Sequence, residues 1–222
     1  MPTEENAKKV CKDTRDFFKL EGGLKSGNKL FYTSNDESGV PSRTEGKHAT
    51  RYGNFIRATK ALVNLRKLYP SVDPPTPWKI GTIMVQQSCR FGNCHEMCFV
   101  STKYAADIPV NSWVVEIQYP GDHVFCVLAD QKPAWTSLTN MATSEAADVW
   151  IVDAWAKLYS TPNNYLAQLL AKFDTWAGLN KRVSWQKATG GKAIMVHPSF
   201  GEYQEATKTS ALKYTAHNEN WL

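Results

Sequence analysis

The stretch that decides the fold is residues 113–129, WVVEIQYPGDHVFCVLA, in which two apolar runs flank a short polar turn. Trp113 to Tyr119 alternates well enough for a strand, and Pro120-Gly121-Asp122 predicts a turn. His123 to Ala129 predicts a second strand, so the whole stretch predicts a β-hairpin with a three-residue loop. An antiparallel sheet built on this hairpin is therefore the expected centre of the fold.

The segments next to the hairpin predict further elements of the same unit. Cys94 to Ala106 predicts a helix that follows a turn over Cys89 to Asn93, and residues 130–147 read as a loop. Val149 to Val152 is a short apolar strand that runs into Asp153, and Tyr165 to Trp176 predicts another helix. Helices followed by antiparallel strands indicate an α+β fold.

The two ends of the chain are less regular. The expected elements there are a helix over Glu4 to Leu20, an irregular arm over residues 21–50 with a short strand at Leu30 to Tyr32, a helix over Asn54 to Tyr69, and strands at Lys79 to Val85 and, as the last one, Lys192 to Val196. The Pro-rich segment Ser71 to Pro77 predicts a stiff linker. We therefore expect N-terminal helices and a basic arm over residues 1–77 and the catalytic core over residues 78–222, in one compact unit.

Composition excludes several classes of protein. With 222 residues, 42% of them hydrophobic, the chain has the size of one globular domain, and no apolar stretch is long enough to span a bilayer. The first residues carry charges where an export signal needs an apolar run, so we expect a soluble, cytoplasmic protein. Residues 1–70 hold 14 Lys and Arg against 8 Asp and Glu, a net +6, and the rest holds 12 against 13, a net −1. The basic residues are scattered singly, which favours a solvated or docking surface over nucleic-acid binding.

Five cysteines, at positions 11, 89, 94, 98 and 126, form the first local anomaly. An odd number cannot pair completely, and a chain of this length without an export signal is a poor candidate for a disulfide framework. The cluster of three within residues 89–98 leaves a reactive thiol, a metal site or buried apolar cysteines as interpretations. Cys89, Cys94, His95 and Cys98 offer four soft ligands, but structural zinc usually draws its ligands from two separated pairs.

Cys94 is the candidate nucleophile because Gly92-Asn93 places it in the first turn of the predicted helix. The unpaired N–H groups and the positive end of the helix dipole there favour thiolate over thiol, and the same groups can bind an oxyanion. Cys98, one turn later, would be deeper. A buried structural cysteine is the alternative interpretation.

A thiol nucleophile needs a base and a group that orients it. His123 opens an apolar strand and is the candidate base, with His197 in reserve; His95 would point about 100° away from Cys94 on the helix. Asp153 ends a buried strand, where a carboxylate needs a partner such as His123. The alternative roles are a solvated turn residue for His123 and a helix N-cap for Asp153.

The segments GNCHEM, DHVFCVL and VDAW resemble the transglutaminase-like branch of the papain-like cysteine enzymes. The resemblance covers about 65 residues, Cys89 to Trp155, and departs from the family pattern at Ala154, where proline is usual, and in the 30 residues between His123 and Asp153. It implies a cysteine-led helix packed on an antiparallel sheet, and a triad of Cys94, His123 and Asp153 with no metal or cofactor. It also implies oxyanion or substrate-binding roles around the triad, for which the candidates are Gln87, Asn93 and Trp155.

The expected function is thiol-dependent acyl transfer on amide bonds of proteins, most simply a glutamine deamidase or a transglutaminase-type enzyme. A cysteine protease of the same fold and a non-enzymatic interaction module with a structural cysteine cluster are the alternatives. The resemblance extends to bacterial effectors and toxins, which implies delivery into a target cell without a signal peptide. Expected partners are a protein substrate and an inhibitory (immunity) protein or chaperone, with neither nucleic acid nor membrane.

Overall fold

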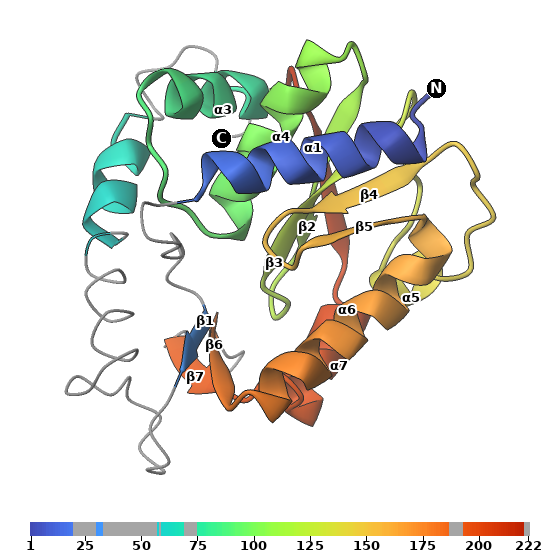
Figure 1. Cartoon of the computed structure of the whole chain (residues 1–222). Coiled ribbons are helices and arrows are strands. Elements are labelled where there is room, and N and C mark those ends of the chain that lie inside the picture. Colours follow the sequence, from blue (N-terminus) through green and yellow to red (C-terminus); the bar gives the residue numbers. More distant parts are fainter. Residues whose placement is uncertain (20–29, 33–56, 58, 69–74, 187–192, 220–222) are drawn as a thin grey trace.

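A computed structural model shows a mixed α+β fold around a five-stranded antiparallel sheet (Figure 1). The structure describes residues 1–19, 30–32, 57, 59–68, 75–186 and 193–219. The strand order is β5-β4-β3-β2-β8, with every neighbouring pair antiparallel. The strands are β2 (Ser112–Ile117), β3 (His123–Leu128), β4 (Trp150–Asp153), β5 (Leu158–Ser160) and β8 (Leu212–Ala216).

The predicted hairpin is the centre of this sheet. Strands β2 and β3 pair from Ser112 opposite Leu128 to Ile117 opposite His123, so residues 118–122 form the connection, longer than the predicted three-residue loop. The backbone donors of this connection bond outside the hairpin: Gln118 N–H donates to the Ala211 carbonyl, and Gly121 N–H donates to Ser210 Oγ at 3.0 Å. The strands therefore end early because the segment before β8 takes over their hydrogen bonds.

One face of the sheet is covered by α1 (Glu4–Phe17), α3 (Pro77–Gln86) and α4 (Cys94–Asp107), together with the helical residues 59–66 (Figure 1). Alternate sheet residues such as Val114, Cys126 and Val152 point into this layer, as the period of two in a strand requires. They share one apolar core with Val10 of α1 and Phe99 of α4. The N-terminal helix is therefore part of the same core as the cysteine-led helix.

The opposite face is covered by α5 (Leu138–Met141), α6 (Pro162–Gly178), α7 (Gly201–Thr209) and a small antiparallel sheet of order β1-β6-β7 (Figure 1). The strands of the small sheet are β1 (Leu30–Tyr32), β6 (Lys181–Gln186) and β7 (Ala193–Val196). Phe125 and Ile151 of the large sheet pack here against Phe173 of α6 and Tyr203 of α7. The large sheet is thus the middle of three layers.

Most of the predicted elements near the site are present. The helix predicted from Cys94 spans Cys94–Asp107, the one predicted from Glu4 spans Glu4–Phe17, and the one predicted around Tyr165 spans Pro162–Gly178. Residues 57 and 59–66 of the predicted second helix are helical; its remaining residues, most of the arm and residues 71–74 of the linker lie outside the described residues.

The strand predicted over Lys79 to Val85 is wrong, because this segment is helix α3. Thr76 caps the helix by accepting a hydrogen bond from Lys79 N–H on Oγ1 at 3.2 Å, and Pro77 occupies the first turn, where its missing donor costs nothing. Pro77, Ile80, Gly81 and Met84 are the buried positions, which is helical spacing. The short apolar run favoured a strand, and these two signals of a helix start were overlooked.

The part of the chain that follows β3 differs from expectation in several places. The predicted strand over Lys192 to Val196 is present as Ala193–Val196, but it is not the last one: α7 and β8 follow, and β8 joins the edge of the large sheet beside β2. Strands β5 and β6 were not predicted, and α5 lies within the predicted loop of residues 130–147.

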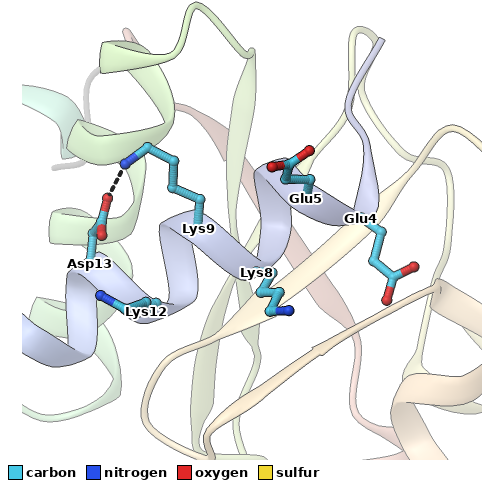
Figure 2. A pocket seen from close by; sticks show the side chains of 6 residues that line it. All are labelled: Glu4, Glu5, Lys8, Lys9, Lys12 and Asp13. Carbon is cyan, nitrogen blue, oxygen red and sulfur yellow. Dashed lines mark hydrogen bonds and ion pairs between the residues drawn. The ribbon is translucent and has the colours of Figure 1, made fainter.

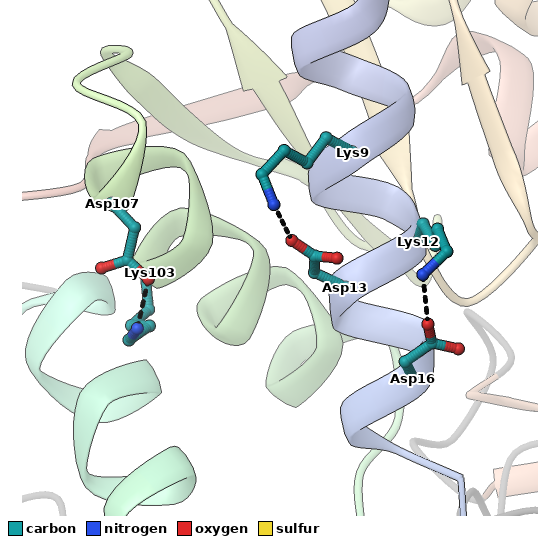
Figure 3. A network of polar contacts seen from close by, with 6 residues as sticks. All are labelled: Lys9, Lys12, Asp13, Asp16, Lys103 and Asp107. Atoms are coloured by element: carbon teal, nitrogen blue, oxygen red, sulfur yellow. Dashed lines mark hydrogen bonds and ion pairs between the residues drawn. The ribbon is translucent and has the colours of Figure 1, made fainter.

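The solvent faces of α1 and α4 carry ion pairs four residues apart (Figure 3). They are Lys9 with Asp13 at 2.6 Å, Lys12 with Asp16 at 2.8 Å, and Lys103 with Asp107. Pairs at this spacing contribute only a few tenths of a kcal/mol each, about 0.2–0.5, and they mark the outer side of each helix. In the described part of the chain, no helix has the length and apolar character that crossing a bilayer demands.

Candidate active site

Cys94 begins α4, with Asn93 as its N-cap in extended geometry. Glu96, in the first turn, accepts a hydrogen bond from Asn93 N–H at 3.0 Å and is fully buried. Gly92 is required by close packing, because a Cβ added there would lie 2.6 Å from Glu96 Cβ and 2.9 Å from Phe18 Cε1. The Gly-Asn turn thus delivers Cys94 to the helix end as the sequence predicted, and packing by α1 fixes its position.

Arg66 forms an ion pair with the buried carboxylate of Glu96. Its Nε and Nη2 donate to Glu96 Oε1 at 2.9 and 2.7 Å, while half of the Arg66 side chain remains exposed. A buried carboxylate is costly unless it is paired and hydrogen-bonded, and Glu96 is both. The helical residues 59–66 are therefore tied directly to the turn that carries Cys94, a connection that sequence reasoning missed.

His123 and Asp153 meet at the ends of β3 and β4. His123 is the first residue of β3 and Asp153 is the last residue of β4, so the antiparallel pairing of the two strands brings both residues to the same end of the sheet. His123 Nε2 lies 2.7 Å from Asp153 Oδ2, and both side chains are only 1% exposed. The structure thus brings the predicted base and the predicted orienting acid into direct contact.

Asp153 has two further hydrogen-bond donors around it. Tyr165, from α6, donates its hydroxyl to Oδ2 at 2.8 Å, and Ala156 N–H donates to Oδ1 at 2.9 Å. The helix N-cap considered for Asp153 is absent, because residues 154–157 form turns that lead into β5. Sequence reasoning missed Tyr165, since nothing in a tyrosine near the start of a helix indicates a carboxylate partner on a distant strand.

The electrostatics of the pair favour its charged form. Burial by itself would lower the pKa of His123, but the charge and hydrogen bond of Asp153, with a smaller contribution from Cys94, raise it to about 9. Burial by itself would raise the pKa of Asp153, yet His123, Ala156 N–H and the Tyr165 hydroxyl lower it. Both shifts favour the imidazolium–carboxylate form of the pair.

Cys94 completes the constellation. Its thiol lies near enough to the His123 ring to contribute to the raised pKa of that histidine. Among the residues that the structure describes, His123 Nδ1 is buried without a hydrogen-bond partner, while Nε2 is taken by Asp153. Nδ1 is therefore the ring nitrogen left to exchange a proton with the sulfur, and hydrogen bonds of this kind often tighten only when substrate binds.

The other cysteines have different surroundings, although all five are free thiols. Burial raises the pKa of Cys11 to about 12 and also raises the pKa of Cys89. Cys98 is buried against Cys126, and burial followed by that neighbour raises its pKa well above the usual value. A thiol that resists ionisation is a poor nucleophile, so Cys11, Cys89 and Cys98 are poor candidates for that role.

Of the remaining predicted residues that the structure describes, only Trp155 contacts the His–Asp pair. The half-buried Trp155 ring lies 5.1 Å from the His123 ring and packs edge-on against Trp176 at 4.9 Å, so it covers the His–Asp pair. Gln87 is the exposed C-cap of α3, and in the described part of the chain it makes no hydrogen bond with a triad residue. His197 bonds Ser199 through Nδ1 at 2.6 Å, away from the triad.

Comparison with protein-family models, with curated proteins and with solved structures finds no match for this chain. The candidate site therefore rests on the geometry alone.

Two other features of the described residues bear on where a ligand could bind. No group of three or more His, Cys, Asp or Glu side chains within the described ranges is arranged to hold a metal ion. An open depression runs along α1 and contains no triad residue (Figure 2). Acidic and basic side chains of this one helix line it: Glu4, Glu5, Lys8, Lys9, Lys12 and Asp13. Its mixed charge is typical of a solvated helix face.

Proposed function

We propose that this chain is a thiol-dependent acyl-transfer enzyme that acts on amide bonds of proteins. One observation carries the proposal: a cysteine in the first turn of a helix lies beside a buried histidine whose other ring nitrogen is held at 2.7 Å by a buried aspartate. Nucleophile, base and orienting acid in this arrangement are the recurring machinery of covalent acyl transfer.

The reaction follows from the positions of the three groups. Cys94 thiolate attacks the amide carbon, and the N–H groups at the start of α4 are placed to bind the oxyanion that forms. His123 then gives its proton to the leaving nitrogen, and the C–N bond breaks to leave a thioester on Cys94. An incoming water or amine loses a proton to His123, attacks the thioester and releases the thiolate. Asp153 and Tyr165 hold the imidazole in place throughout.

The burial of Cys94 favours a glutamine side chain as the substrate amide. Cys94 is only 3% exposed, and a carboxamide at the end of two methylene groups can enter a narrow opening. A backbone amide carries chain on both sides and needs an extended cleft. Water as acceptor then gives deamidation and an amine gives cross-linking, so the proposal is a deamidase or a transglutaminase-type enzyme.

The biological setting proposed for this activity is that of an effector or toxin that acts inside a target cell. An enzyme that alters glutamine residues of host proteins would need an inhibitory protein or a chaperone in the cell that makes it. This setting predicts that expression of the protein in the cytosol arrests growth and that the arrest depends on Cys94. A co-expressed inhibitory partner should relieve the arrest.

The test is intact-mass analysis of a glutamine-rich protein such as casein after incubation with the enzyme, with and without a biotinylated primary amine. A gain of about one dalton per site indicates deamidation, amine attachment with loss of ammonia indicates cross-linking, and fragments indicate proteolysis. Cys94→Ala should abolish the change while retaining the fold, and His123→Ala, which leaves the buried Asp153 carboxylate without its partner, should abolish it as well. Cys89→Ala, which alters a half-buried thiol outside the triad, is the matched control and should keep full activity. Full activity in Cys94→Ala would refute the triad.

A further inference from the structure

A second imidazole–carboxylate pair lies beside Cys94. His95, the next residue of α4, has Nε2 at 3.9 Å from Oε1 of Glu116, a residue of β2. The Cys94 thiol is also within hydrogen-bonding reach of the His95 ring. The His95 ring packs edge-on to Phe99, with centroids 6.3 Å apart. Cys94 is thus flanked by two histidines, each backed by its own carboxylate.

The two pairs differ in exposure. The His123 side chain is 1% exposed and that of His95 is 31% exposed. His95 is therefore the more open of the two imidazoles, whereas His123 is enclosed by Asp153 and Trp155. An imidazolium that is partly exposed to solvent can stay protonated throughout a reaction, while the enclosed imidazole of His123 exchanges its proton with the reacting groups.

The groups around His95 support a stable positive charge. Burial would lower the pKa of His95, but Cys94 and Glu116, with Glu96 at longer range, raise it to about 10. Glu116 in turn has its pKa lowered mainly by His95, against the effect of burial, with a contribution from Lys213 on the neighbouring strand β8. The groups facing this pair from α4, β2 and β8 thus combine to keep His95 protonated near neutral pH.

We propose that His95, held by Glu116, is a second catalytic imidazole, which acts as a fixed positive charge beside the Cys94 sulfur and carries no proton to the substrate. This inference rests on the proposed use of Cys94 as a nucleophile. His123 must gain and lose a proton in each turnover, so its charge is absent for part of the cycle. His95 would keep one cation beside the sulfur when the thiolate attacks and again when it is released. Glu116 is a positioning residue that acts through His95.

The test measures thiolate formation directly and needs no substrate. The rate of iodoacetamide alkylation of Cys94, followed by peptide mass analysis from roughly pH 5 to pH 9, reports the fraction of thiolate. His95→Gln should move the midpoint for Cys94 upward by about 1 unit or more, as expected when a cation in contact is removed. Glu116→Gln should move it in the same direction by less, and His95→Lys, which keeps a positive charge, should restore much of the loss. Cys89 in the same samples and a His197→Gln variant are the controls, and neither should shift.

Contact with a cation should shift the pH midpoint of Cys94 alkylation by about 1–3 units. The inference is overturned if the midpoint in His95→Gln lies within about 0.3 unit of that in the parent protein. If His95→Gln does not fold, Glu116→Gln decides the question by the same criterion. The outcome is separate from that of the proposed function. If the midpoint shifts but no acyl transfer to test proteins occurs, the role of His95 stands and the proposed reaction is refuted. If acyl transfer occurs but the midpoint does not shift, the proposed reaction stands and the role of His95 is refuted.

Discussion

Replacement of Asp153 by asparagine should destabilise the protein in a strongly pH-dependent way. The Asp153 carboxylate is 1% exposed and accepts hydrogen bonds from His123, Tyr165 and Ala156 N–H. Removing one partner of a buried, hydrogen-bonded charge pair typically costs roughly 3 to 5 kcal/mol of unfolding free energy. We expect a loss of that size near pH 6, where His123 is protonated.

The loss should shrink as the pH rises. A histidine whose pKa is raised on folding stabilises the native state fully below its unfolded value of 6.5, and this contribution disappears as the pH passes through the folded value of about 9. At 1.36 kcal/mol per unit, the rise from 6.5 to about 9 corresponds to about 3 kcal/mol. The difference between parent and Asp153→Asn should therefore be about 3 kcal/mol smaller near pH 9 than near pH 6.

The assay is urea denaturation of both proteins at the two pH values. His95 is present in both proteins, so its own titration cancels in the difference. Asp174→Asn, which alters an exposed carboxylate on α6, is the control and should change stability by less than about 0.5 kcal/mol at either pH. In a Cys94→Ala background most of the pH-dependent difference in stability between Asp153 and Asn should persist, because Asp153 raises the pKa of His123 more than Cys94 does. Equal destabilisation at both pH values would show that the pair is uncharged in the native protein and would refute the reasoning.

Three further substitutions test the support around the triad. Tyr165→Phe removes the hydroxyl that donates to Asp153 at 2.8 Å and should cost about 1–3 kcal/mol of unfolding free energy by urea denaturation; an unchanged midpoint would contradict this hydrogen bond. Gly92→Ala forces a Cβ to within 2.6 Å of Glu96 Cβ and should cost about 1–3 kcal/mol while slowing alkylation of Cys94. Arg66→Met leaves the buried Glu96 carboxylate without its cation and should cost about 1–3 kcal/mol, and Glu96→Gln in the same protein should recover part of that loss.

The sequence predicted the three central residues because each stands at a local signal. The Gly-Asn turn marks the start of the helix at Cys94, the Pro-Gly-Asp turn marks the start of the strand at His123, and Asp153 ends an apolar run. These signals depend on neighbours in the chain, and the structure places all three side chains together.

The features that sequence reasoning missed depend on contacts between distant elements. Tyr165 meets Asp153 only because α6 packs against the end of β4, and His95 meets Glu116 only because α4 lies along β2. Helix geometry alone predicts that His95 points away from Cys94, whereas the packing of α4 on the sheet places His95 Nε2 3.9 Å from Glu116 Oε1. Strand β8 was missed because its partner, β2, lies about a hundred residues earlier in the chain.

The way α1 is attached has a consequence for the synthesis of this protein. Arg15 donates to the Ala154 carbonyl at 2.7 Å and Cys11 to the Leu158 carbonyl at 3.6 Å, across 139 and 147 residues. The complete docking surface of α1 therefore exists only after β4 and β5 have been made, whereas α4, which α1 also contacts, is made earlier. The apolar side of α1, with Ala7 and Val10, stays partly uncovered during that interval, and the triad is completed only when translation has passed Asp153.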